Sequence, residues 1–255
     1  MKFLLWRHHQ SILMKTIISA LLLGIFSCKN LVSASVLLWP TNLHIHNQEK
    51  SIALWVENTG KTTQVLQARI YAWSLKDGQD QLVNQSNFMI SPPIAKIAPG
   101  KKQLFRVVSR VPTPAAQQQN YRVILDEIPQ KANAKQLDKE TVYQGVQFQF
   151  RYSIPLFSYG QGLSNEARKK IELAAVVKQL SWKVGQKEGK KVLTVTNNGP
   201  YYVNIGQLNF VKDPSAEGVG GYLLPKSSRE WEFSGEIGQA LYGRINGSEL
   251  IQIGR

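Results

Sequence analysis

The residue types that most often carry out chemistry are few in this chain, and their spacing suits it poorly. His44 and His46 would lie on the same side of an extended strand and could supply two metal ligands. A zinc site needs three or four ligands, and residues 35–255 contain no HExxH motif, no cysteine and no other histidine to supply the rest. Asp126 and Glu127 are adjacent, so on a strand they point to opposite faces and make a poor acid–base pair.

Glycine-rich motifs of enzymes are missing from the sequence as well. There is no G-x-S-x-G elbow, and the lysine-rich stretch from Gly185 to Lys191 has the wrong spacing for a P-loop. Gly218–Gly221 is an isolated glycine cluster and indicates a loop between strands. We therefore expect no catalytic residue, no bound metal and no cofactor, and a protein that is not an enzyme.

One strand pattern stands out instead, in the segment Thr141–Phe157, which reads TVYQGVQFQFRYSIPLF. Val146, Phe148 and Phe150 alternate with polar residues, the period of a β-strand with one apolar face. The polar segment Gln130–Glu140 before it has no core-forming pattern. Such an apolar face either serves an internal core or is kept for another chain, and this choice decides the function.

The N-terminus has the features of a secretory signal peptide covering residues 1–34. A basic start at Met1 or Met14 precedes the apolar run Ile17–Phe26, and Val32–Ala34 supplies small residues at the cleavage site. The run is shorter than the roughly 20 residues needed to span a bilayer. An alternative is lipidation of Cys28, although the bulky Phe26 fits a lipoprotein cleavage box poorly.

Charge and cysteine usage narrow the partners of the exported chain. The formal net charge is +14, and the leader holds four cations and no acid, so residues 35–255 carry 14 − 4 = +10. Nucleic acid is not expected as a partner, because the chain is exported and has no basic helix or RNP-like motif. The only cysteine lies in the leader, so we expect no disulfide. Because the apolar run is too short to span a bilayer, we also expect no stable insertion into the membrane.

The remaining sequence predicts strands separated by turn residues. The first half contains about seven short strands: Ser35–Asn47, Ser51–Asn58, Gln64–Trp73, Phe88–Pro93, Ile94–Ile97, Lys102–Ser109 and Tyr121–Ile128. Pro40 interrupts the first of them and indicates an edge strand or a switch between sheets. In the second half, Ile171–Lys183 fits a strand or a short helix, and we favour a strand. Further strands are expected at Lys191–Thr196, Tyr201–Phe210, Gly221–Pro225, Ser228–Phe233, Leu241–Ile245 and Leu250–Ile253.

These strands predict an all-β chain of two sandwiches in tandem. The first would cover residues 35–157 and include a donor strand at residues 142–157. Residues 158–170, with two glycines, would form a linker to a second sandwich at residues 171–255.

Several motifs, in their order, resemble the PapD-like periplasmic pilus chaperones. They are ENTG at Glu57–Gly60, SPPIAKIAPGKKQLFRV at Ser91–Val107, YRVILDEIP at Tyr121–Pro129, GVQFQFRYSIPLF at Gly145–Phe157, NNGPYYVNI at Asn197–Ile205 and LLPKSS at Leu223–Ser228. The opening VLLWP at Val36–Pro40 and the dipeptide Ala72–Trp73 are similar to the archaic branch, which assembles Csu-type pili of spore-coat-U-like subunits.

The resemblance implies two immunoglobulin-like domains in an L shape that bind pilin subunits in the periplasm and deliver them to an outer-membrane usher. In this family the chaperone's G1 strand fills the gap left by a missing pilin strand, which is donor-strand complementation. Val146, Phe148 and Phe150 would then fill the groove of the subunit. Self-association of the free protein would hide the apolar strand, because an exposed apolar edge invites aggregation.

One departure from the family concerns the C-terminal carboxylate of the subunit. Conventional members bind it with an arginine on the first strand and a lysine in G1, but alignment places Asn42 and Pro155 at these positions. Arginine suits such a carboxylate because it can bind both oxygens. Arg122, on the strand before G1, is the first candidate, and Arg106 and Arg151 are weaker ones; Arg122 could instead be solvated or paired with Glu127.

Two other classes compete with a chaperone. A secreted β-sandwich adhesin or pilus subunit would be about one domain long, with a donor extension at its N-terminus. A carbohydrate-binding module would need an exposed aromatic platform, and Tyr201 and Tyr202 form the only adjacent aromatic pair.

Overall fold

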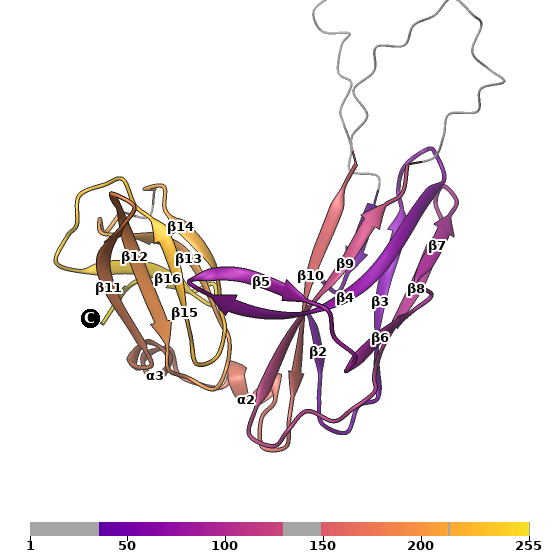
Figure 1. Ribbon diagram of the computed structural model, residues 1–255, viewed down its shortest axis with the longest axis horizontal. Coiled ribbons are helices and arrows are strands. Elements are labelled where there is room, and N and C mark those ends of the chain that lie inside the picture. Colours follow the sequence, from indigo (N-terminus) through magenta and orange to yellow (C-terminus); the bar gives the residue numbers. More distant parts are fainter. Residues whose placement is uncertain (1–35, 130–148, 214, 255) are drawn as a thin grey trace, which may run out of the picture. The chain divides into compact units, whose positions relative to one another are not determined.

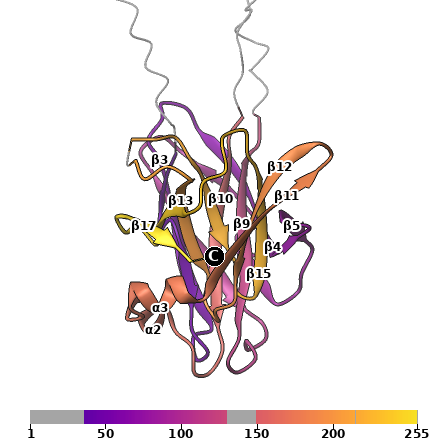
Figure 2. The same ribbon diagram turned by 90° about the vertical axis from the view of Figure 1, so that its left-hand side faces the viewer.

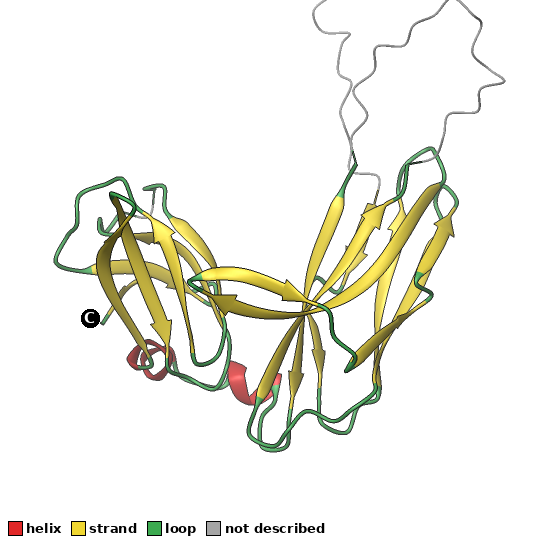
Figure 3. Ribbon diagram, viewed as in Figure 1, coloured by secondary structure: helices red, strands yellow, loops and turns green. Residues whose placement is uncertain are grey.

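The computed structural model describes residues 36–129, 149–213 and 215–254, and almost all of its regular structure is β-strand (Figure 1, Figure 3). The predicted leader with Cys28, and the groove-filling candidates Val146 and Phe148, lie outside the described residues. The strands form four sheets, two in each half of the described chain. The expected pair of immunoglobulin-like β-sandwiches in tandem is therefore confirmed.

The first sandwich is built from two sheets. One contains β1 (Val36–Trp39), β3 (Ser51–Asn58), β8 (Lys102–Ser109) and β6 (Phe88–Ser91), in that order. The other has the order β2 (Leu43–Ile45), β10 (Arg151–Tyr159), β9 (Gln118–Glu127), β4 (Gln64–Lys76) and β5 (Gln79–Val83), with β7 (Ile94–Ile97) also paired to β4. Alternate residues of these strands, among them Leu54, Phe105, Val123 and Leu156, form one continuous core.

Pro40 marks the point where the chain changes sheets, as its position predicted. Before it, β1 pairs with β3 in an antiparallel manner. After it, β2 lies in the other sheet and pairs in parallel with β10. Residues 36–45 thus supply one edge strand to each sheet, and Asn42 directly precedes the edge strand that pairs with β10.

The second sandwich is smaller and has its own core. Its sheets are β11 (Leu180–Lys187), β12 (Lys190–Asn197) and β15 (Ser227–Glu232), and β14 (Val219–Leu223), β13 (Val203–Asn209), β16 (Leu241–Ile245) and β17 (Leu250–Ile253). The antiparallel pair β11 and β12 is seen in Figure 2. The expected hairpin of β16 and β17 is confirmed, with Asn246 and Gly247 both at positive φ in the turn.

The prediction of a strand at Ile171–Lys183 was wrong for its first half. Residues Leu173–Lys178 form the helix α3, and β11 begins only at Leu180. Alanines 174 and 175 favour a helix, and the spacing of Leu173, Val176 and Val177 places apolar side chains on one helical face. Val176 is accordingly buried in the second core, and Val177 packs against it.

The segment 158–170, predicted as a linker, is structured at both ends. Ser158 and Tyr159 complete β10, and the short helix α2 (Asn165–Lys169) begins at Ser164, whose hydroxyl accepts a hydrogen bond from the Ala167 N–H. The structure also contains a third cluster of buried hydrophobic residues, which we call the aromatic cluster. It joins side chains of both sandwiches: Trp73, Phe157, Tyr159, Tyr201, Tyr202 and Leu224.

Candidate functional site

The strand β10 carries an apolar series that begins before the sandwich core does. Ile154 and Leu156 are buried in the first core, and Tyr152 packs against it. Two residues earlier, Phe150 belongs to the same alternating series but is 39% exposed. Its backbone still pairs with β9, because the Glu127 N–H donates to the Phe150 carbonyl at 3.1 Å. The apolar series of the strand therefore continues to a side chain that is only partly covered.

The opposite face at this end of the strand is charged and already paired. Asp126 accepts hydrogen bonds from Arg151, at 2.5 Å, and from Arg69. Burial opposes ionisation of Asp126, but these bonds hold the pKa of its carboxyl below the ordinary value. Arg151, one of the three candidate anchors, is thus engaged by an acid of its own domain.

Arg106 lies away from the other two candidates. It belongs to β8, in the sheet opposite to that of β10, and donates to the Ser51 hydroxyl at 3.3 Å. The structure thus brings Arg122 and Arg151 onto one sheet and separates Arg106 from them.

Arg122 occupies the position that the alignment makes most relevant. In the register of β9 and β10 it lies directly opposite Pro155, where the family resemblance leads us to expect the lysine of conventional members. Paired residues project on the same face of a sheet, so its side chain can serve the space that the lysine would serve. Its other cross-strand neighbour is Tyr71 of β4.

The guanidinium of Arg122 is held by aromatic rings. Its central carbon lies 3.7 Å from the ring centroid of Trp73 and 5.3 Å from that of Tyr222. Burial lowers the pKa of Arg122, and within the described residues no carboxylate forms an ion pair with it. Glu127, the alternative partner, accepts a hydrogen bond from the Tyr152 hydroxyl at 3.0 Å. Arg122 is therefore a partly desolvated cation that has no carboxylate paired with it within the described residues.

Asn42 lies at the same place in the fold. The Tyr222 hydroxyl donates to Asn42 Oδ1 at 2.9 Å, and the Tyr222 ring is the second one that faces Arg122. Of the two positions expected to differ from the conventional anchor pair, Pro155 thus pairs with Arg122, and Asn42 is linked to Arg122 through the Tyr222 side chain.

The surroundings of Arg122 include residues that the sequence did not single out. Trp73 was noted only as part of a motif, and Asp80 and Arg229 were not noted at all. Trp73 Nε1 donates to Asp80 Oδ1 at 2.6 Å, and Asp80 forms an ion pair with Arg229. Asp80 and Arg229 are 149 residues apart in the chain, so no local pattern announces their contact.

The two histidines, His44 and His46, contact different partners. His44 Nδ1 is 3.0 Å from the Tyr159 hydroxyl, and its ring stacks on Phe157. His46 Nε2 is 3.4 Å from a carboxylate oxygen of Glu166. In the described part of the chain, no group of three or more potential metal ligands occurs.

The aromatic pair considered as a carbohydrate platform is not exposed. Tyr201 and Tyr202 are both buried in the aromatic cluster, where the Tyr202 ring stacks on Phe157 with centroids 3.7 Å apart.

Over the described residues, no helix is long and apolar enough to cross a bilayer.

Two tandem immunoglobulin-like sandwiches, with one strand offering an apolar face past its own core, define the class of pilus chaperones. The family model described as "Pili and flagellar-assembly chaperone, PapD N-terminal domain" matches residues 35–164. The model for the C-terminal domain of the pili assembly chaperone PapD matches residues 175–246. The chain belongs to this family.

Individual relatives agree with the family and with its archaic branch. A solved structure of the CsuC–CsuE chaperone–tip adhesion subunit complex, from the archaic Csu pili of Acinetobacter baumannii, matches with a TM-score of 0.70 and 33% identity, covering 87% of this chain and 99% of that chain. The probable fimbrial chaperone YadV of Escherichia coli K12 is 27% identical over 177 residues, which are 68% of this chain and 66% of YadV. LpfB, a probable fimbrial chaperone of Escherichia coli O157:H7, is 28% identical over 61% of this chain and 63% of its own length.

Proposed function

We propose that this chain is a periplasmic chaperone that binds pilin subunits by donor-strand complementation and delivers them to an outer-membrane usher, with no catalytic activity of its own. The observation that carries the proposal is the exposure of Phe150 at the end of an otherwise buried apolar series on β10. Val146 and Phe148 continue that series in the sequence. The match to a chaperone–subunit complex from an archaic system supports the same reading.

In this proposal the strand contributes in two ways. Its backbone adds a strand to the incomplete subunit, and its alternate side chains enter the subunit core. Each of the three apolar side chains, Val146, Phe148 and Phe150, yields about 1.5–3 kcal/mol on burial, before ordering costs. When no subunit is bound, pairing of two chaperones through this strand would cover the same face.

Arg122 is the residue we assign to the C-terminal carboxylate of the subunit. It lies opposite Pro155, is partly desolvated, and has no carboxylate paired with it in the described ranges. A guanidinium in such surroundings binds a carboxylate with less competition from water. Arg151 is a weaker candidate because Asp126 already holds it.

Phe150→Asp tests the donor strand. A charge on the apolar face cannot enter a subunit core, so recovery of an affinity-tagged pilin from the same genome should fall at least about tenfold on co-expression. Phe148→Asp should act in the same way. The matched control is Gln149→Asp, which adds the same charge on the opposite face and should leave recovery unchanged.

The variants must also remain folded for this result to count. Thermal unfolding followed by circular dichroism should give the same midpoint for Phe150→Asp and for the unmodified protein. Normal pilin recovery with Phe150→Asp would exclude the proposed role. A large loss of stability would assign Phe150 to the internal core instead.

Arg122→Ala tests the carboxylate anchor. We expect recovery of pilin complexes to fall about tenfold or more, because a charge-assisted contact contributes roughly 1.5–3 kcal/mol. The chaperone itself should stay folded, since Arg122 has no ion pair within the described chain. Arg106→Ala is the control on the other sheet, and equal recovery for both variants would refute the assignment.

A further inference from the structure

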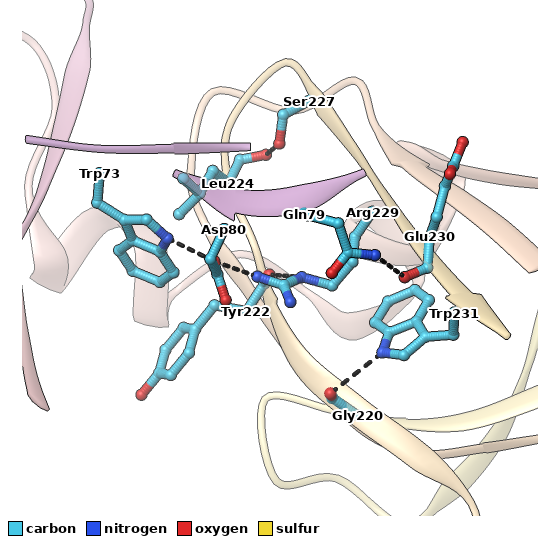
Figure 4. Close-up of polar contacts among 10 residues, drawn as sticks. All are labelled: Trp73, Gln79, Asp80, Gly220, Tyr222, Leu224, Ser227, Arg229, Glu230 and Trp231. Carbon is cyan, nitrogen blue, oxygen red and sulfur yellow. Dashed lines mark hydrogen bonds and ion pairs between the residues drawn. The ribbon is translucent and has the colours of Figure 1, made fainter. Parts of the chain in front are cut away.

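The tip of the β4–β5 hairpin reaches the second sandwich and contacts β15. The Glu230 N–H donates to the Gly78 carbonyl at 3.0 Å. Gln79 Nε2 lies 3.4 Å from the Glu230 carbonyl oxygen (Figure 4). Gly78 has φ of +77°, and a Cβ there would lie 2.8 Å from the Glu230 nitrogen and closer still to its side chain. Only glycine therefore permits this approach.

The contact places Asp80 between two partners, one from each sandwich. Asp80 accepts a hydrogen bond from Trp73 Nε1 on one side and forms an ion pair with Arg229 on the other (Figure 4). The Arg229 side chain is only 11% exposed, and its Nε also donates to the Tyr222 carbonyl at 2.9 Å. Arg229 thus holds both Asp80 and the adjoining strand β14.

Arg122 lies on the other side of the same tryptophan. Its guanidinium stacks on the Trp73 ring, whose N–H is fixed by Asp80. Burial is the main cause that lowers the pKa of Arg122, while the charge of Asp80 raises it and that of Arg229 lowers it. Asp80 and Arg122 thus both contact Trp73, and the cation that pairs with Asp80 is Arg229.

We propose that Asp80 and Arg229 are positioning residues for Arg122. Asp80 fixes the indole on which Arg122 stacks, and Arg229 occupies Asp80 so that Arg122 stays available for an incoming carboxylate. This inference rests on the proposed role of Arg122 as the carboxylate anchor. Arg229, on the second sandwich, would then keep Arg122, on the first sandwich, available to bind a carboxylate.

The test is a carboxylate titration of the whole chain, labelled with ¹⁵N. Acetate is the probe, the neutral acetamide is its control, and the Arg122 Nε–H and Trp73 indole resonances report binding. Acetate, but not acetamide, should shift both resonances in the unmodified protein. Arg229→Gln should weaken acetate binding about fivefold or more, because the released Asp80 then competes for Arg122.

The double variant Asp80→Asn with Arg229→Gln separates positioning from simple structural support. It removes the competing carboxylate but keeps an oxygen acceptor for Trp73, so acetate affinity should return to within about twofold of the original. If the double variant binds as weakly as Arg229→Gln, the proposal is wrong. It is also wrong if Arg229→Gln binds acetate normally, or if acetate shifts neither resonance in the unmodified protein.

Two further variants complete the design. Lys190→Gln breaks another ion pair that involves β15, between Lys190 Nζ and Glu232 Oε2 at 2.8 Å, and should leave the acetate titration unchanged. Arg122→Ala should abolish the acetate shift of the Trp73 indole. If Arg122→Ala abolishes pilin recovery while Arg229→Gln retains acetate affinity, the positioning role fails alone. If pilin recovery survives Arg122→Ala while the titrations follow the scheme, the anchor role fails and the positioning of Arg122 stands.

Discussion

His44 is kept neutral by its position against aromatic rings. It stacks with Phe157, Tyr159 and Tyr202, and its Nδ1 contacts the Tyr159 hydroxyl. Burial, followed by the nearby positive charges of Arg168, Lys169 and His46, lowers the pKa of His44 from 6.5 to about 4; the charge of Glu166 acts in the other direction. The folded protein therefore resists binding a proton at a site where the unfolded chain accepts one readily.

A loss of stability in mild acid follows from this pKa. Because the folded pKa is lower than the unfolded one, the contribution of neutral His44 is complete above pH 6.5 and is lost progressively as the pH falls towards 4. In His44→Gln this part of the pH dependence should disappear. Thermal melts from pH 8 to pH 4 should therefore fall less steeply for His44→Gln than for the original chain. Parallel curves would contradict the assignment, whatever the difference in stability at pH 7.

At the level of single residues, the sequence led to Arg122 but not to its surroundings. The choice of Arg122 followed from local information: its strand precedes G1, and Pro155 excludes the usual lysine. Trp73 and Asp80 could not be chosen in the same way, because their importance depends on a stacked ring and on an ion pair formed with Arg229 from the other sandwich.

Two turns, one in each sandwich, are built around a buried asparagine that ends a strand. Asn58 donates to the carbonyls of Thr62 and Ile97, and its Oδ1 accepts from the Gly60 N–H. Asn197 makes the matching arrangement: it donates to the Tyr201 carbonyl at 2.7 Å and accepts from the Gly199 N–H at 2.8 Å. Both side chains are buried, so these bonds have no water to replace them.

Asn58→Asp should be strongly destabilising although it hardly changes shape. The substitution places an oxygen where an N–H₂ group meets two carbonyl oxygens, and it buries a charge. We expect the free energy of unfolding to fall by about 2–3 kcal/mol or more, measured by urea denaturation. Asn84→Asp, on an exposed residue, should change it by no more than about 0.5 kcal/mol. A stability loss as small as that of the control would show that the turn does not depend on Asn58.

Among the elements, strands with an apolar period were predictable and those without one were not. The strand β5 was missed because its sequence QDQLV is largely polar and both of its faces are mostly exposed. The helix α3 was mistaken for a strand because Leu173, Val176 and Val177 fit an apolar run of either type over so few residues. In both cases the deciding information is the packing of neighbouring elements.

At the scale of the molecule, the division into two sandwiches follows from two independent cores. The buried side chains of each core come from one half of the described chain, and the family models match those two halves in turn. What the sequence could not indicate is how the halves meet. The aromatic cluster and the contact of Gly78 with Glu230 join residues far apart in sequence, for which strand patterns carry no information.

The contact between the β4–β5 hairpin and β15 also affects which sheet edges can pair with another chain. β15 is the outer strand of its sheet, and its free side would otherwise present backbone donors to any passing extended chain. The tip of the β4–β5 hairpin occupies that side at Glu230. A chaperone that is proposed to donate one strand to an incomplete subunit must keep its other sheet edges from pairing. Gly78, by permitting this close approach, thus keeps the edge of β15 at Glu230 from pairing with another extended chain.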